Sequence, residues 1–229
     1  FGEVVRKNNY PRKMVVGLIG SCTNSSYEDL TRAVSIVKYA REQGVPVKAQ
    51  FLINPGSEQI RYTAERDGIL DEFDKAGATI IANACGPCIG QWKRDDVADN
   101  RTNSIVTSFN RNFAKRNDGN PNTHAFVTSP ELVAALTIAG DLCFNPLTDT
   151  LLNDKGDAVK LPEPKGFEMP PLGYEVKDAG YLAPSPEAGV EVTIDPQSNR
   201  LQKLQPFPAW DGKDYTNLPL LIRVQGKCT

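Results

Sequence analysis

The feature that most constrains the fold is an alternation of short apolar runs with helical patterns over residues 1–140. The apolar runs are typical of strands and lie at 14–19, 48–53, 78–82, 104–107 and 124–127. Helical apolar spacing or helix-forming composition is found at 25–44, 57–67, 70–75 and 129–139. Strands that alternate with helices predict an α/β fold, in which a mostly parallel sheet carries helices on both faces.

Capping residues mark where two of these helices begin. Ser25 and Glu28 have the spacing of a capping box, in which each side chain accepts a hydrogen bond from the other residue's backbone amide. Ser129-Pro130-Glu131 combines a capping Ser with Pro at the first helical position and an acid beside it. Residues 1–13 are polar, carry charges of both signs, and are predicted to be an incoming tail.

The chain changes character after its predicted last helix, since 11 of its 17 prolines fall between 141 and 229. We therefore expect two parts, an α/β domain at 1–140 and an extended linker at 141–229. Short strands are expected within the linker at 190–194 and 218–224. Its aromatic residues, such as Trp210, predict that it packs on something, and we expect it to lead toward a C-terminal domain that this chain lacks.

Composition and charge argue against several classes of function. A formal net charge of −2 predicts no general attraction to nucleic acid or to a membrane surface. No apolar run approaches the roughly 20 residues of a transmembrane helix. Five cysteines are an odd number in a chain too large to need disulfides, which favours a reducing compartment.

Three cysteines follow strand-like runs: Cys22 follows the first run, and Cys85 and Cys88 follow the third. Because ligands bind outside the carboxyl ends of strands in such sheets, these thiols are expected near one edge. Thiolates are the usual ligands of iron–sulfur clusters, and Gly86-Pro87 makes the second loop tight. A cluster held by three thiolates leaves one iron open, and an open iron acts as a Lewis acid on a substrate oxygen.

Three other interpretations of these cysteines are open at this point. Cys85-Gly86-Pro87-Cys88 is also the motif of thioredoxin-like dithiol oxidoreductases, but such a pair is expected to open a helix early in a small domain. Here Trp92 follows the pair instead of preceding it. Zinc is the second alternative, although a structural zinc site takes four ligands and His124, the only histidine, is distant in sequence. The third is that the cysteines are inert.

A second candidate group follows the fourth strand-like run and contains Asn110, Arg111 and Arg116. Arginine holds carboxylate or phosphate in a bidentate fork, but an arginine pair in a loop is more often simply an exposed charged surface. A position on the same strand edge as the cysteines shifts the interpretation toward anion binding. The segment 93–96 carries charges of both signs and is predicted to be a solvated face. No glycine-rich phosphate loop is found, so the sequence does not support nucleotide binding.

Long motifs in the chain resemble a known family. Residues 17–29 and 82–92, which hold Gly-Ser-Cys-Thr-Asn-Ser-Ser and Ala-Cys-Gly-Pro-Cys-Ile-Gly-Gln-Trp, resemble the two cluster-binding signatures of the aconitase family. Residues 110–113 and 124–131 match the family too. The likeness covers essentially the whole chain, and 105–111 resembles the mitochondrial branch more than the cytosolic, RNA-binding one.

The resemblance implies a reaction and a cofactor. Aconitases interconvert citrate and isocitrate through cis-aconitate by dehydration and rehydration, as lyases of the tricarboxylic acid cycle. They work at a 4Fe–4S cluster that has three cysteine ligands. By motif position, the resemblance makes Cys22, Cys85 and Cys88 those ligands.

The resemblance also implies roles around the cluster and a setting for the protein. It implies that Asn110 lies near the cluster and that Arg111 and Arg116 bind carboxylates of the substrate. It implies the mitochondrial matrix as location, a monomer when the protein is full length, and no nucleic-acid or membrane partner.

Aconitases are much longer than this chain, which therefore resembles the third domain and the linker to the fourth. The family's other domains supply histidines, carboxylates, a serine base and further arginines. We accordingly expect the isolated chain to be inactive and to need the missing domains of the same polypeptide. A non-catalytic domain with empty cysteine loops is the remaining alternative, and iron content distinguishes it.

Overall fold

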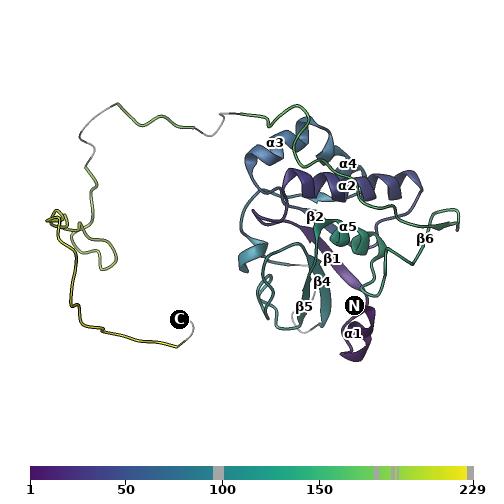
Figure 1. Ribbon diagram of the computed structural model, residues 1–229, viewed down its shortest axis with the longest axis horizontal. Helices are drawn as coiled ribbons and strands as arrows, with labels where there is room; N and C mark the ends of the chain where they lie inside the picture. The colour runs from purple at the N-terminus through teal and green to yellow at the C-terminus, as the bar shows by residue number, and fades with distance from the viewer. Residues whose placement is uncertain (95–100, 178–180, 187–188, 190, 226–229) are drawn as a thin grey trace. The chain divides into compact units, whose positions relative to one another are not determined.

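The computed structural model describes residues 1–94, 101–177, 181–186, 189 and 191–225 of the chain (Figure 1). Its contacts divide the chain into two compact units, Phe1–Gly180 and Tyr181–Thr229. The predicted α/β domain ends at residue 140, whereas the first unit continues to Gly180. The assignment of the rest as a linker toward a further domain stays a prediction.

The first unit is built on a five-stranded sheet with the order β3-β2-β1-β4-β5. Its strands are β1 (Met14–Ile19), β2 (Gln50–Ile53), β3 (Thr79–Ile80), β4 (Asn103–Thr107) and β5 (Thr123–Val127). Every neighbouring pair is parallel, and in the centre Gly17 of β1 is in register with Phe51 and Val106. The predicted α/β class with a parallel sheet is confirmed.

Five α-helices accompany the sheet in the described part of the chain: α1 (Gly2–Lys7), α2 (Tyr27–Glu42), α3 (Glu58–Arg66), α4 (Ile69–Lys75) and α5 (Pro130–Ala139). The capping box of α2 is formed by Ser26 and Asp29, so the predicted pair Ser25 and Glu28 is wrong by one residue. The reason is that Ser25 is buried and its hydroxyl donates to Ser21 O (2.7 Å). None of the helices described here has the length and apolar character needed to cross a membrane.

The two faces of the sheet are covered differently. Side chains alternate along a strand, so Phe51 and Val106 point to a core shared with α2, α4 and α5. Helix α2 packs on both α4 and α5 (Figure 1). Leu18 points to the opposite face, into a second cluster that Cys88 and Trp92 complete. Helix cover was predicted on both faces, but none of the five helices contributes to this second cluster. From the segment after β3, Cys88 and Trp92 pack against this face.

The first residues form a helix, and the predicted incoming tail is wrong. Helix α1 buries Val5, which is only 1% exposed. The rings of Phe1 and Tyr10 lie 5.3 Å and 5.4 Å from the ring of Phe126 on β5. These apolar residues pack at the edge of the sheet, and that packing orders a segment whose polar composition predicts none.

The proline-rich part differs from prediction in two ways. Residues 141–180 contain an unpredicted antiparallel hairpin of β6 (Leu151–Leu152) and β7 (Ala158–Val159). In the second unit, 191–194 and 218–224 contain no strand, so the strands predicted there are wrong; residue 190 lies outside the described residues. A short apolar run without a pairing partner does not form a stable strand. Trp210, expected to pack, is 69% exposed.

Candidate functional site

The predicted site residues lie after strands whose carboxyl ends share one edge of the sheet. Cys22 follows β1, Cys85 and Cys88 follow β3, and the segment from Asn110 to Arg116 follows β4. Because these strands are all parallel, the three loops emerge on the same side. This edge is where α/β sheets generally bind their ligands.

The Cys22 loop is held against the end of β4 by Ser108. The Ser108 hydroxyl is buried, accepts a hydrogen bond from Gly20 N (2.9 Å) and donates to Asn24 O (2.8 Å). Ser21 has a left-handed backbone (φ 76°), and its hydroxyl accepts from Asn24 N (3.2 Å). Cys22 itself is exposed, so its thiol is accessible to a ligand.

The Cys85–Cys88 loop is a tight turn that ends in a short 3-10 helix, Pro87–Ile89. Its backbone is closed by Ile89 N, which donates to Cys85 O (3.0 Å). Cys85 is exposed, whereas Cys88 is 9% exposed and packs in the second hydrophobic cluster. A thioredoxin-like dithiol is expected at the start of a long helix, and this cysteine pair does not lie in that setting.

The loop after β4 contacts the Cys88 turn directly. Asn117 Nδ2 donates to Pro87 O (3.1 Å), and Arg116 Nη2 lies 3.9 Å from Cys88 Sγ. A Cβ atom at Gly90 would lie 2.8 Å from Arg116 O, and Gly90 has a φ of 90°, so only glycine fits there. The two loops therefore form one contact surface around Cys88.

The three predicted residues of this loop differ in exposure. Asn110 and Arg111 are exposed. Arg116 is half-buried, its guanidinium lies 5.1 Å from the ring of Phe113, and its Nε is buried without a hydrogen-bond partner in the described structure. An unsatisfied buried guanidinium donor is costly, and an anionic ligand would remove that cost.

Arg94 is buried, contrary to the predicted solvated face. Arg94 Nη1 lies 3.1 Å from Asp118 Oδ2 and donates to Asn103 Oδ1 (2.9 Å), and the side chains of Arg94 and Asp118 are each 4% exposed. Thr123 Oγ1 donates to the same Asp118 oxygen (2.6 Å). This buried network connects the segment after the cysteine turn to β4 and β5, while residues 95 and 96 lie outside the described residues.

The donor set fits a soft metal centre in its chemistry and location. Three thiols on adjacent loops are ligands of the kind that iron–sulfur clusters use, and Arg116 offers positive charge beside Cys88. Within the described ranges, however, no three His, Cys, Asp or Glu side chains are gathered closely enough to hold a metal ion. The ligand roles of Cys22, Cys85 and Cys88 thus stay a proposal.

Two other potential metal ligands lie away from these loops. His124 is on β5, and its ring lies 4.9 Å from the ring of Tyr10. Cys143 Sγ donates to Gly2 O (3.7 Å) near α1. Neither provides the fourth ligand that a structural zinc site takes.

Three polar residues that the sequence analysis left without a role connect the cysteine loops: Asn54, Ser108 and Asn117. All three are buried, and each donates to a backbone carbonyl of a cysteine loop, Asn54 to Ala84 O (2.9 Å). Asn54 and Ser108 directly follow β2 and β4, and Asn117 lies further along the loop after β4, so the only sequence signal is a small polar residue in a segment that follows a strand. That signal also describes ordinary turns, so it does not identify them without the structure.

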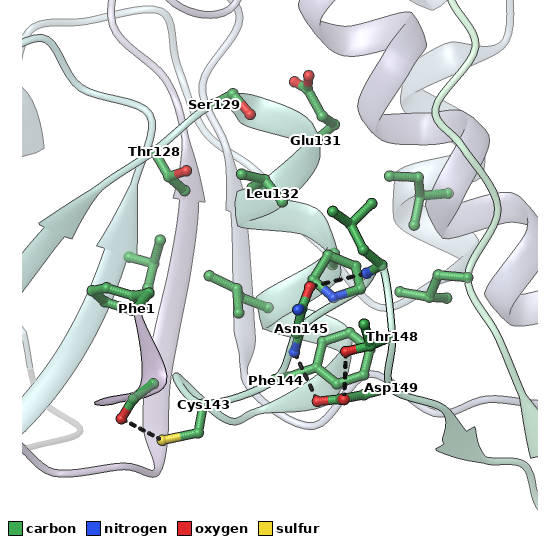
Figure 2. A pocket seen from close by; sticks show the side chains of 18 of the residues that line it. Phe1, Thr128, Ser129, Glu131, Leu132, Cys143, Phe144, Asn145, Thr148 and Asp149 are labelled. Carbon is green, nitrogen blue, oxygen red and sulfur yellow. Dashed lines mark hydrogen bonds between the residues drawn. The ribbon is translucent and has the colours of Figure 1, made fainter. Parts of the chain in front are cut away.

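A groove of about 1440 Å³ lies elsewhere on the first unit, between α5, β5 and the segment after α5 (Figure 2). Phe1, Leu132 and Phe144 line it together with Thr148 and Asp149. None of the six predicted site residues lines it. The groove is therefore separate from the cysteine loops.

Comparisons with known proteins agree on one family. The model of the aconitase family (aconitate hydratase) matches residues 3–140. The mitochondrial aconitate hydratase of Gracilaria gracilis is 57% identical over 230 residues, which are 100% of this chain and 30% of that protein. That of Saccharomyces cerevisiae is 55% identical over 228 residues, which are 99% of this chain and 29% of that protein.

A third relative carries the same region inside a fusion. The aconitase-ribosomal protein bL21m fusion protein of Schizosaccharomyces pombe is 52% identical over 233 residues, which are 100% of this chain and 25% of that protein. This chain thus spans less than a third of the length of these relatives.

Proposed function

The chain belongs to the aconitase family, and we propose that it is the part of an aconitate hydratase that holds the iron–sulfur cluster. The reaction proposed for the whole protein is the reversible isomerisation of citrate and isocitrate through cis-aconitate. Water leaves and re-adds, so the enzyme is a hydro-lyase of the tricarboxylic acid cycle. Because its relatives are named mitochondrial, we propose the mitochondrial matrix as its location.

The cofactor proposed is a 4Fe–4S cluster with Cys22, Cys85 and Cys88 as ligands. Cys22 and Cys85 are exposed, and Cys88 lies beside the guanidinium of Arg116, which brings positive charge to the site. When bound, such a cluster supplies an iron without a protein ligand, which polarises a substrate oxygen as a Lewis acid. The role of the chain's own loops is to orient three thiolates toward one centre.

Arg111 and Arg116 are proposed to bind carboxylates of the substrate, with Asn110 near the cluster. A guanidinium holds a carboxylate with two parallel N–H···O bonds, which fixes orientation as well as affinity. Arg116 supports this role because its buried Nε lacks a partner in the described part of the chain. Arg111 is exposed in the loop after β4, at the same edge of the sheet.

The observation that carries the proposal is that buried side chains connect the loops of all three cysteines at the carboxyl edge of the sheet. The dithiol alternative has no support from the family match. The partners proposed are citrate, isocitrate, cis-aconitate and the rest of a longer polypeptide, as a monomer. No nucleic-acid or membrane partner is proposed.

Iron uptake is the measurement that tests this function. After anaerobic reconstitution with iron and sulfide, we expect a sulfur-to-iron charge-transfer band and bound iron in the chain, both lost in Cys85→Ser. Cys143→Ser is the matched control and should keep both, because Cys143 lies near Gly2 and α1. Equal iron in Cys85→Ser and the unaltered chain would contradict the proposal. The chain alone is expected not to convert citrate, since it spans about 30% of its relatives.

A further inference from the structure

The turn Asn54-Pro55-Gly56 lies between the loops of Cys22 and Cys85. It connects Ile53, the last residue of β2, to Ser57, which caps α3. In the sheet, β2 is flanked by β1 and β3, whose ends carry the two cysteine loops. The turn therefore occupies the central position between two loops whose cysteines are separated by more than 60 residues of sequence.

On one side, Asn54 holds the loop of Cys85. Asn54 is 2% exposed, and its Nδ2 donates to Ala84 O (2.9 Å), the carbonyl that directly precedes Cys85. The β2–β3 pairing continues up to this point, because Ile81 N donates to Ile53 O (2.8 Å). A buried amide bonded to this carbonyl restricts where the Cys85 backbone lies.

On the other side, the same turn packs against the loop of Cys22. Asn54 N donates to Ile19 O (2.8 Å), and Gly56 N donates to Ser25 O (3.1 Å). A Cβ atom at Gly56 would lie 3.0 Å from Ser25 O and 3.4 Å from Cys22 O. A side chain at Gly56 would therefore crowd the carbonyl of Ser25 and contact that of Cys22, and glycine avoids this crowding.

We propose that Asn54 and Gly56 are positioning residues that set the loops of Cys22 and Cys85 relative to each other. This proposal rests on the proposed function, because it assigns the turn to the cluster site. Groups that orient metal ligands without touching the metal have large effects on metal affinity. Pro55 suits this role, since its ring restricts the backbone between the two contacts.

Hydrogen exchange in the metal-free chain is the first test. In Asn54→Ala, we expect the amide of Ile89, which bonds Cys85 O, to exchange about tenfold faster. In Gly56→Ala, the same increase is expected at the amide of Asn24, which bonds Ser21 Oγ. A turn that only contributes stability would instead raise exchange across the whole sheet, including Leu18.

Matched controls separate local positioning from general destabilisation. Thr63→Ala truncates another buried polar side chain, whose hydroxyl donates to Gln59 O (2.7 Å) within α3. Gly2→Ala adds a Cβ with ordinary contacts, none shorter than 3.4 Å. Both variants should leave the exchange of Ile89 and Asn24 unchanged. If Asn54→Ala does not fold, the exchange of Asn24 in Gly56→Ala by itself tests whether the turn positions the loops.

Cluster retention is the second test. After reconstitution, iron loss to a chelator is expected to be about tenfold faster in Asn54→Ala than in the unaltered chain or Thr63→Ala. Unchanged exchange at Ile89 and Asn24 would overturn the proposal, and so would altered exchange with unchanged iron loss. If the unaltered chain takes up no iron, the proposed function fails for this chain, and hydrogen exchange by itself decides whether the turn positions the loops.

Discussion

The side chain of Tyr27 lies in the core of the first unit and is 2% exposed. Its phenolic hydroxyl donates a hydrogen bond to Asp67 Oδ2 (2.8 Å). Burial disfavours the charged phenolate, and with the bond to Asp67 it raises the pKa of Tyr27 to about 12. Arg66 bonds the Asp67 carboxylate and lowers the pKa of Asp67, which keeps that acceptor charged. The pair thus connects the start of α2 to the end of α3.

The raised pKa of Tyr27 predicts a loss of stability at alkaline pH. The folded state binds the phenolic proton of Tyr27 more tightly than the unfolded state does. The contribution of Tyr27 to the free energy of unfolding is therefore full below pH ~10 and is lost as pH rises through about 12. Tyr27→Phe should lower the free energy of unfolding by about 1 kcal/mol at neutral pH. Its deficit relative to the unaltered chain should shrink at alkaline pH, as measured by urea unfolding. If the difference in unfolding free energy between Tyr27→Phe and the unaltered chain stayed constant with pH, the raised pKa would be contradicted.

At the scale of elements, α5 approaches β1 at Gly17, and no side chain fits between them. A Cβ atom at Gly17 would lie 1.7 Å from Thr137 Oγ1 and 2.9 Å from Thr137 Cβ. Thr137 is fully buried, and its hydroxyl donates to Val133 O (2.6 Å) within the helix. Close packing here keeps α5 against the central strand, directly before the loop of Cys22.

Gly17→Ala is therefore expected to cost roughly 3 kcal/mol of unfolding free energy or more, because β1 and α5 must separate. Thr137→Ala removes the hydroxyl that meets the new methyl group first. In the double variant the loss should be smaller than the sum of the two single losses, which chemical denaturation of all four chains measures. Strict additivity would show that the contact between these elements does not set the cost.

For the whole molecule, the first unit contains the hydrophobic core. The largest fully buried side chains of the described residues all lie between Val5 and Leu142. In the second unit, large apolar side chains such as Phe207, Tyr215 and Leu221 are each more than 80% exposed. Folding of the first unit thus depends on contacts made before residue 181.

A chain that ends at Gly180 is accordingly expected to unfold cooperatively, with a Tm within about 3 °C of the full chain, since that shift corresponds to about 1 kcal/mol at this size. Circular dichroism during heating measures it. As a control, removal of residues 1–10 should lower the Tm more, because Val5 and Tyr10 pack at the sheet. Loss of the cooperative transition in the shortened chain would contradict the assignment of the core.

Much of the first unit and the location of its candidate site were predictable from the sequence, because they depend on local patterns. Apolar runs and capping residues located the five strands and four of the five helices among the described residues. Since parallel strands share one carboxyl edge, the positions of Cys22, Cys85 and Arg111 after strands also predicted at which edge of the sheet their loops lie. Local patterns therefore place each of these elements to within a few residues.

The burial and structure of several segments depend on residues that are distant in the chain and become neighbours only in the folded protein. Whether Arg94 is solvated or buried depends on Asp118, and whether residues 2–7 form a helix depends on packing near Phe126. In the sequence Asn54 is indistinguishable from an ordinary turn residue, and its position between two cysteine loops follows only from the order of β1, β2 and β3 in the sheet. Such contacts follow from burial and from how distant segments pack, and no local pattern of residues encodes them.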